Sequence, residues 1–183
     1  MRSTLICFTL LSACGSSAPE TATPTKPTVP SVPAVQPNSI VVSGTRSGAS
    51  FTFTCNNPGH ELGADTSVSK SETSFHVSCA DAATGLAANC TVHLTVGDQP
   101  ITDDESTGRI NLNFQPPGKD DGFDQVTTSA SGALGSARGT GTTTITSWDA
   151  GTGHIVGSST MTWEKDNSGA PGTLTIAFDV IAP

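Results

Sequence analysis

The stretch Phe75-His76-Val77-Ser78-Cys79 alternates an apolar with a polar side chain at every step. Because successive side chains of a β-strand point to opposite faces of the sheet, this alternation indicates a strand with one buried and one solvated face. The stretch Cys90-Thr91-Val92-His93-Leu94 mirrors it. We therefore predict an antiparallel hairpin with an apolar inner face. Its opposed residues would be Cys79 and Cys90, Val77 and Val92, Phe75 and Leu94, and His76 and His93.

The same alternation recurs along the rest of the chain from about residue 39. Its inward sets include Phe51, Phe53 and Cys55, then Ile110, Leu112 and Phe114, then Ile155, Met161 and Trp163, and finally Leu174, Ile176, Phe178 and Val180. Glycine, Asn and Asp turns separate these sets, and no stretch has a helical repeat. The sequence therefore predicts one all-β domain over residues 39–183, an antiparallel β-sandwich or small barrel of about 8–9 strands.

Composition narrows the possible partners. The chain has 183 residues and a net charge of -8, only 13% of its residues are charged, and it has no Tyr. An acidic chain with dispersed Lys and Arg repels a phosphate backbone, so we expect no nucleic-acid binding. A domain of about 145 residues buries enough surface to fold alone, and we expect no cofactor.

The N-terminus has the order of an export signal. Arg2 precedes an apolar run that is too short to cross a bilayer and is followed by small residues. The run ends at Leu11-Ser12-Ala13-Cys14, which resembles the lipobox of bacterial lipoproteins. That resemblance implies a signal peptide over residues 1–13 and acylation of Cys14, and Gly15 in place of Asp resembles lipoproteins sorted to an outer membrane.

A proline-rich segment follows the lipobox. Residues 14–38 hold six of the 12 prolines, spaced by Thr, Ser, Ala and Val. This composition cannot bury a core and favours an extended conformation, so we expect a tether between the lipidated cysteine and the domain. Fully extended, it would reach about 70 Å from the membrane.

Three cysteines remain for the folded domain. Cys55, Cys79 and Cys90 all fall on inward positions, and outside the cytoplasm two of them should form a disulfide. We favour Cys79 with Cys90 because the predicted hairpin brings them together, while Cys55 paired with either of them is the alternative. A zinc site of three thiolates is disfavoured, because the Cys-x-x-Cys spacing is missing.

Several residues could bind a metal. His76 and His93 would be cross-strand neighbours, which is a possible start of a zinc or copper site, but no third ligand is evident. The turn with Asp120, Asp121 and Asp124 is the better calcium candidate, although it lacks the EF-hand pattern. In each case a solvated polar group is the favoured interpretation, and we expect no metal.

No catalytic constellation stands out. The sequence has no Gly-x-Ser-x-Gly elbow and no His-Glu-x-x-His motif. Residues 141–163, two strand-like stretches joined by a turn at 150–153, resemble a recurring hairpin of small β-rich bacterial lipoproteins and secreted proteins of uncharacterised function. The resemblance implies a β-sandwich or barrel and supplies no catalytic residue.

Together these features predict a lipid-anchored protein of the bacterial cell envelope, in the outer membrane or facing the periplasm. Its β domain would be non-enzymatic, and would bind an unknown protein or glycan or serve a structural role. A metal-binding module is the first alternative, and an envelope hydrolase is the second.

Overall fold

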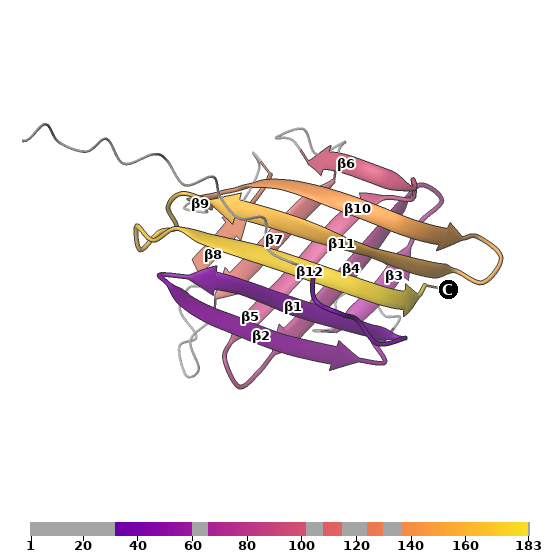
Figure 1. The fold of residues 1–183 in the computed structure, drawn as a ribbon, viewed down its shortest axis with the longest axis horizontal. Coiled ribbons are helices and arrows are strands. Elements are labelled where there is room, and N and C mark those ends of the chain that lie inside the picture. The colour runs from indigo at the N-terminus through magenta and orange to yellow at the C-terminus, as the bar shows by residue number, and fades with distance from the viewer. Residues whose placement is uncertain (1–31, 60–65, 102–107, 115–123, 130–136, 183) are drawn as a thin grey trace, which may run out of the picture.

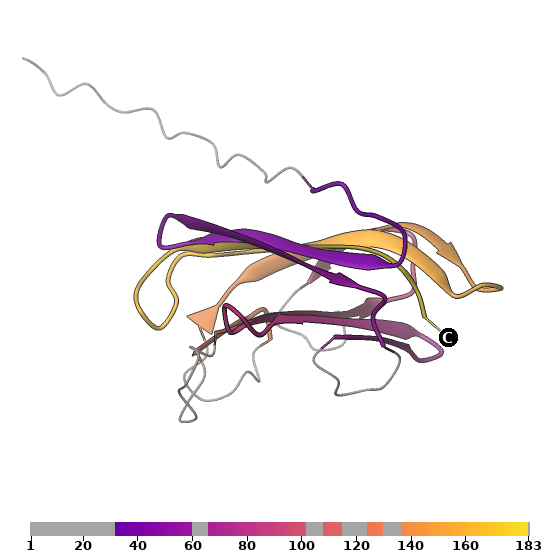
Figure 2. The ribbon, with the colours of Figure 1, turned by 90° about the horizontal axis from the view of Figure 1, so that it is seen from below.

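The computed structural model describes residues 32–59, 66–101, 108–114, 124–129 and 137–182. These residues form an all-β fold of two six-stranded sheets packed face to face, which confirms the predicted sandwich (Figures 1 and 2). With 12 strands in the described part of the chain, the count exceeds the predicted 8–9, because short edge strands carry little alternation of their own. No helix in these ranges could span a bilayer.

We call the first layer sheet A. Its strands, in spatial order, are β2 (Ala49–Asn56), β1 (Ser39–Arg46), β12 (Gly172–Ile181), β11 (His154–Trp163), β10 (Thr140–Asp149) and β6 (Gly97–Ile101). All neighbours in it are antiparallel. The sheet thus joins the N-terminal hairpin of the domain to its three long C-terminal strands.

The second layer is sheet B. Its strands, in spatial order, are β3 (Ser67–Lys70), β4 (Ser74–Asp81), β5 (Leu86–His93), β7 (Arg109–Phe114), β8 (Asp124–Thr127) and β9 (Ala137–Arg138). Among the neighbouring strands that the structure describes in this sheet, β8 and β9 run parallel and the other pairs are antiparallel.

The core lies between the inner faces of the two sheets. Most of the inward residues predicted from alternation are buried, among them Ile176 and Phe178 of β12 and Phe75 and Val77 of β4, whereas Phe51 and Phe53 on the edge strand β2 are only partly buried. The rings of Phe75 and Phe178 meet across the layers with centroids 5.1 Å apart. Gly157 on β11 leaves room for the Phe178 ring, because a Cβ there would lie 3.0 Å from that ring and 2.5 Å from a carbonyl of β10.

The predicted pairing of the β4–β5 hairpin is wrong by two residues. Cys90 lies opposite Val77, and Cys79 lies opposite Ala88. A slip of two leaves each side chain on its predicted face, so the core is unchanged.

The favoured disulfide is wrong as a consequence of this register. Cys79 bonds to Cys55, with the two Cα atoms 5.8 Å apart, rather than to Cys90. The bond joins β2 of sheet A to β4 of sheet B, which is one of the alternative pairings. Cys90 is a buried free thiol, and its burial raises the pKa to about 12 despite hydrogen bonds with Ser159 and Val77. It is therefore protonated and unreactive at neutral pH.

Candidate functional site

The outer face of sheet A is a lattice of small hydroxyl side chains. Across five strands, the register aligns three rows of outward residues. From β2 to β10 the rows are Thr54, Val41, Ala177, Ser158 and Thr144; then Thr52, Ser43, Thr175, Thr160 and Thr142; then Ser50, Thr45, Thr173, Thr162 and Thr140. All positions except Val41 and Ala177 are Ser or Thr. We call these three rows the hydroxyl face.

The spacing of the hydroxyl face follows from sheet geometry. Neighbouring strands lie about 4.8 Å apart, and alternate residues of one strand lie about 6.7 Å apart. The lattice is therefore periodic in two directions.

Some hydroxyls in the lattice bond to one another or to the edge of the sheet. The Oγ1 atoms of Thr45 and Thr173 lie 3.0 Å apart, and Thr144 donates to an Oδ1 of Asp98 at 2.7 Å. The central residue, Thr175, is only 1% exposed between Ser43 and Thr160, and its Oγ1 has no hydrogen-bond partner within the described residues. Thr175 therefore adds no accessible hydroxyl to the face, and Ser158 and Ala177 are buried as well, so the accessible hydroxyls are those of the other positions.

No charged residue occupies the three rows, although the chain as a whole carries -8. The nearest charges lie at the margins: Asp98 on β6, and Asp179, which accepts a 2.7 Å hydrogen bond from Nε2 of His154. A neutral partner could therefore lie on the face without desolvating an ion.

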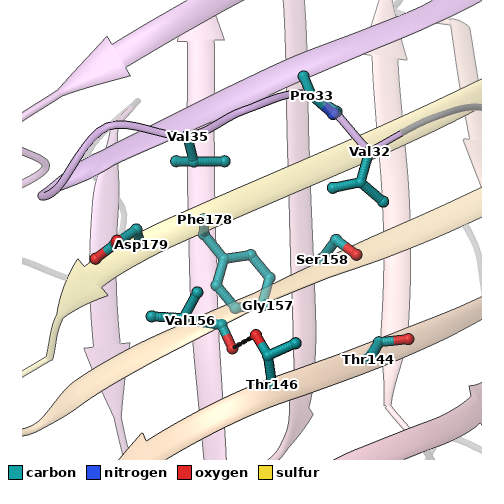
Figure 3. Close-up of a pocket in the computed structure, with 10 residues that line it drawn as sticks. All are labelled: Val32, Pro33, Val35, Thr144, Thr146, Val156, Gly157, Ser158, Phe178 and Asp179. Atoms are coloured by element: carbon teal, nitrogen blue, oxygen red, sulfur yellow. Dashed lines mark hydrogen bonds between the residues drawn. The ribbon is translucent and has the colours of Figure 1, made fainter.

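A groove adjoins the hydroxyl face where the segment before β1 lies on the outer side of sheet A (Figure 2). Val32, Pro33 and Val35 form one wall of this groove of about 390 Å³. Its other lining residues come from β10, β11 and β12: Thr144, Thr146, Val156, Gly157, Ser158, Phe178 and Asp179 (Figure 3). The lining combines aliphatic surface with hydroxyls, and Thr144 and Ser158 belong to both the groove and the hydroxyl face.

A bulge shapes the floor of the groove. The pairing of β10 with β11 shifts between Ile145 and Ser147, so Thr146 is the extra residue, and its Oγ1 donates to the carbonyl of Val156 at 2.9 Å. Bulges bend a strand and increase its local twist. Here the bulged residue, Thr146, lines the groove on the side away from Val32, Pro33 and Val35 (Figure 3).

The two histidines proposed as metal ligands do not face each other. His93 lies opposite Ser74, while His76 lies opposite Thr91 and its Nδ1 is 2.9 Å from the Thr91 hydroxyl. Burial, and then the charge of Arg109, lower the pKa of His76. The expected cross-strand pair is therefore wrong, because the register differs by two residues from the predicted one.

Of the predicted calcium ligands, Asp120 and Asp121 lie outside the described residues. Asp124 pairs with Arg46, Oδ2 to Nη2 at 2.6 Å. Within the described ranges, no group of three His, Cys, Asp or Glu side chains could hold a metal ion.

Arg46 organises an ionic cluster between the sheets. Its Nε donates to Asp166 at 2.5 Å, and its guanidinium carbon lies 3.7 Å from the centre of the Phe114 ring. Burial works to raise the pKa of Asp166, but hydrogen bonds from Ser168, Arg46 and Ala170 and the Arg46 charge outweigh it, so the pKa falls to about 2. The cluster has the character of a structural clamp, since Arg46 pairs with both carboxylates at once.

Comparison with protein-family models, curated proteins and solved structures finds no match for this chain. The lipobox at Cys14 and most of the proline-rich segment lie outside the described residues. The sequence alone did not predict the hydroxyl face. The alternation of each strand predicts which of its residues point outward. It does not predict which strands are neighbours, and the lattice depends on that strand order.

Proposed function

We propose that this protein is a lipid-anchored binding module of the bacterial cell envelope and that its ligand is an uncharged glycan polymer. The hydroxyl face carries this proposal, because it presents a periodic, neutral array to a partner that is itself periodic and rich in hydroxyls. The groove beside it supports the same choice, since aliphatic walls next to hydroxyls suit the mixed polar and apolar faces of a sugar ring.

The energetics favour a polymer over a small sugar. One net hydrogen bond contributes about 0.5–1.5 kcal/mol, and the hydroxyl face has no aromatic ring on which a single sugar could stack. Useful affinity therefore needs many contacts at once, along a chain or over a solid surface. A neutral polymer also avoids repulsion by the net charge of -8.

The anchor is the second part of the proposal. The lipobox ending at Cys14 supports acylation, and the proline-rich segment after it supports a domain held away from the membrane. Mass spectrometry of the mature protein from a bacterial host tests this part. We expect an N-terminal Cys14 bearing acyl chains; a mature chain that starts elsewhere without lipid would contradict it.

Binding can be tested by co-sedimentation with chitin and cellulose, which are insoluble uncharged polysaccharides. We expect the protein to pellet with at least one of them. In the double variant Thr160→Lys/Thr162→Lys, two bulky cations interrupt the lattice, and we expect binding to weaken about tenfold or more, which corresponds to about 1.4 kcal/mol.

The matched control is Thr73→Lys, at an exposed turn next to sheet B. It adds the same chemical group away from the hydroxyl face and should bind like the unaltered protein. Equal binding by the double variant and the unaltered protein would show that the hydroxyl face is not the binding surface. If neither chitin nor cellulose binds the protein, the glycan proposal is refuted.

A further inference from the structure

Three of the four sheet edges carry features that block pairing with another strand. β6 contains Asp98 and Pro100, β3 has four residues and ends at Lys70, and β9 has only two residues. Short strands, charges and proline are the usual means by which native sheets avoid edge-to-edge association. Within the described part of the chain, these edges are protected.

The fourth edge, β2, has none of these features. Its sequence, Ala-Ser-Phe-Thr-Phe-Thr-Cys-Asn, runs for eight residues without a charge or a proline. It alternates β-forming aromatic and hydroxyl residues, and it forms the outer margin of sheet A (Figure 1).

The hairpin turn fixes which backbone groups of β2 are unpaired. Ser47 and Gly48 have φ of 52° and 78°, a two-residue turn, so the flanking Arg46 and Ala49 exchange hydrogen bonds. Bonding then alternates along the strand, and Asn57 N–H donating to the Asn38 carbonyl at 2.9 Å continues the pattern. The N–H and C=O groups of Ser50, Thr52, Thr54 and Asn56 therefore point away from sheet A.

We propose that β2 is a dimerisation edge and that its partner is β2 of a second copy, paired antiparallel about a two-fold axis at Phe53. In this register Thr52 faces Thr54 of the other copy and Ser50 faces its Asn56, so every outward backbone group is used. The pairing forms about eight backbone hydrogen bonds. The two Phe53 rings meet on the inner side, where aromatic pairs are favourable.

Charge favours a second copy as the occupant. Each copy carries -8, so most of its surface repels another copy, but β2 brings no charged side chain to the contact. The two hydroxyl faces would become one continuous face across the joined sheets. Since β2 is the single unprotected edge in the described structure, the association closes as a two-fold dimer and does not grow into a filament.

The test is sedimentation equilibrium of the full chain carrying Cys14→Ser, so that no acyl group brings copies together. We expect the protein to be a monomer at about 1 µM and a dimer at about 1 mM, since dimers with small interfaces dissociate within this range of concentration. It requires no ligand, so its result is independent of the glycan proposal.

Thr52→Pro removes one outward N–H and no hydrogen bond within sheet A, since proline is tolerated where a strand N–H faces solvent. We expect at least a tenfold weaker dimer with a melting temperature close to that of the parent chain. Should this variant unfold, Thr52→Lys/Thr54→Lys serves the same purpose through like-charge repulsion across the axis. Thr160→Lys is the matched control on a central strand and should dimerise like the parent.

Three results would overturn the proposal. The first is a monomer at every concentration, and the second is a dimer that persists unchanged in the folded β2 variants. The third is an assembly that keeps growing with concentration, because the closed two-fold pairing would then be wrong.

Discussion

At the scale of single residues, Arg46 links the two sheets through contacts with three side chains. It contacts Asp166 after β11, Asp124 of β8 and the ring of Phe114 of β7, so it ties sheet A to sheet B at one end of the sandwich. The Asp166 side chain is fully buried and also accepts hydrogen bonds from the turn at Ser168 and Ala170. Removing the cation would leave that carboxylate buried without its counter-charge.

We therefore predict that Arg46→Met lowers the free energy of unfolding at pH 7 by about 2–4 kcal/mol, since breaking a buried ion pair leaves the partner charge buried without a counter-charge. Chemical denaturation measures this loss. Lys70→Met, at an exposed edge position, is the control and should change stability little. A loss no larger than that of the control would show that the clamp is not structural.

The same carboxylate predicts a dependence on pH. The pKa of Asp166 in the folded protein is about 2, below its ordinary value of 3.8. A depressed pKa contributes stability above pH 4 that disappears as pH falls toward 2, here about 1–2 kcal/mol. The difference in the free energy of unfolding between Arg46→Met and the parent should therefore shrink as pH falls from 4 to 2. A constant difference would show that Arg46 stabilises the fold through packing rather than through its charge.

At the scale of elements, alternation identified the long strands and their inward faces, but it could not set the register of β4 against β5. Val77 meets an apolar partner whether it faces Val92 or Cys90, so the core pattern permits both registers. The turn decides between them: the Asp81 carboxylate accepts hydrogen bonds from the Ala83 N–H and the Thr84 hydroxyl. Gly85, with φ of 70°, closes that turn, and such geometry is hard to read from a sequence.

That register decides the disulfide, which predicts the response of the fold to reduction. The Cys55–Cys79 bond closes a loop of 24 residues between β2 and β4, and such a loop contributes about 3–4 kcal/mol. Reduction should lower the melting temperature by about 10 °C in a domain of this size. Calorimetry with and without a reductant measures the shift.

Two variants separate the possible pairings. Cys90→Ala should keep the response to reductant, because the Cys90 thiol takes no part in the bond. Cys55→Ala should abolish the response. The reverse pattern, a response kept by Cys55→Ala and lost in Cys90→Ala, would restore the pairing of Cys79 with Cys90.

At the scale of the whole molecule, the strand order brings the outward residues of separate strands together into one surface. β1 and β2 lie far in sequence from β10, β11 and β12, yet sheet A places all five side by side. The sequence predicts that Thr52, Thr142, Thr160 and Thr175 are outward, and only the long-range pairing shows that they share one row. Non-local pairing of this kind is what single-sequence periodicity cannot supply.

The arrangement separates the two layers by role. Sheet B carries an outer face of amides and imidazoles, including Asn89, Asn111 and His76, and it supports the core. Sheet A carries the uncharged hydroxyl face, with the segment at Val32–Val35 crossing one end of it. A ligand bound to sheet A should therefore leave the outer face of sheet B unaffected.

Methyl NMR of the threonine side chains tests this claim most directly, with soluble oligosaccharides cut from whichever polymer the protein sediments with. We expect the methyl signals of Thr160, Thr162 and Thr173 to shift on titration, while those of Thr91 and Thr127 on sheet B stay in place. Shifts confined to sheet B, or none at a saturating concentration, would contradict it.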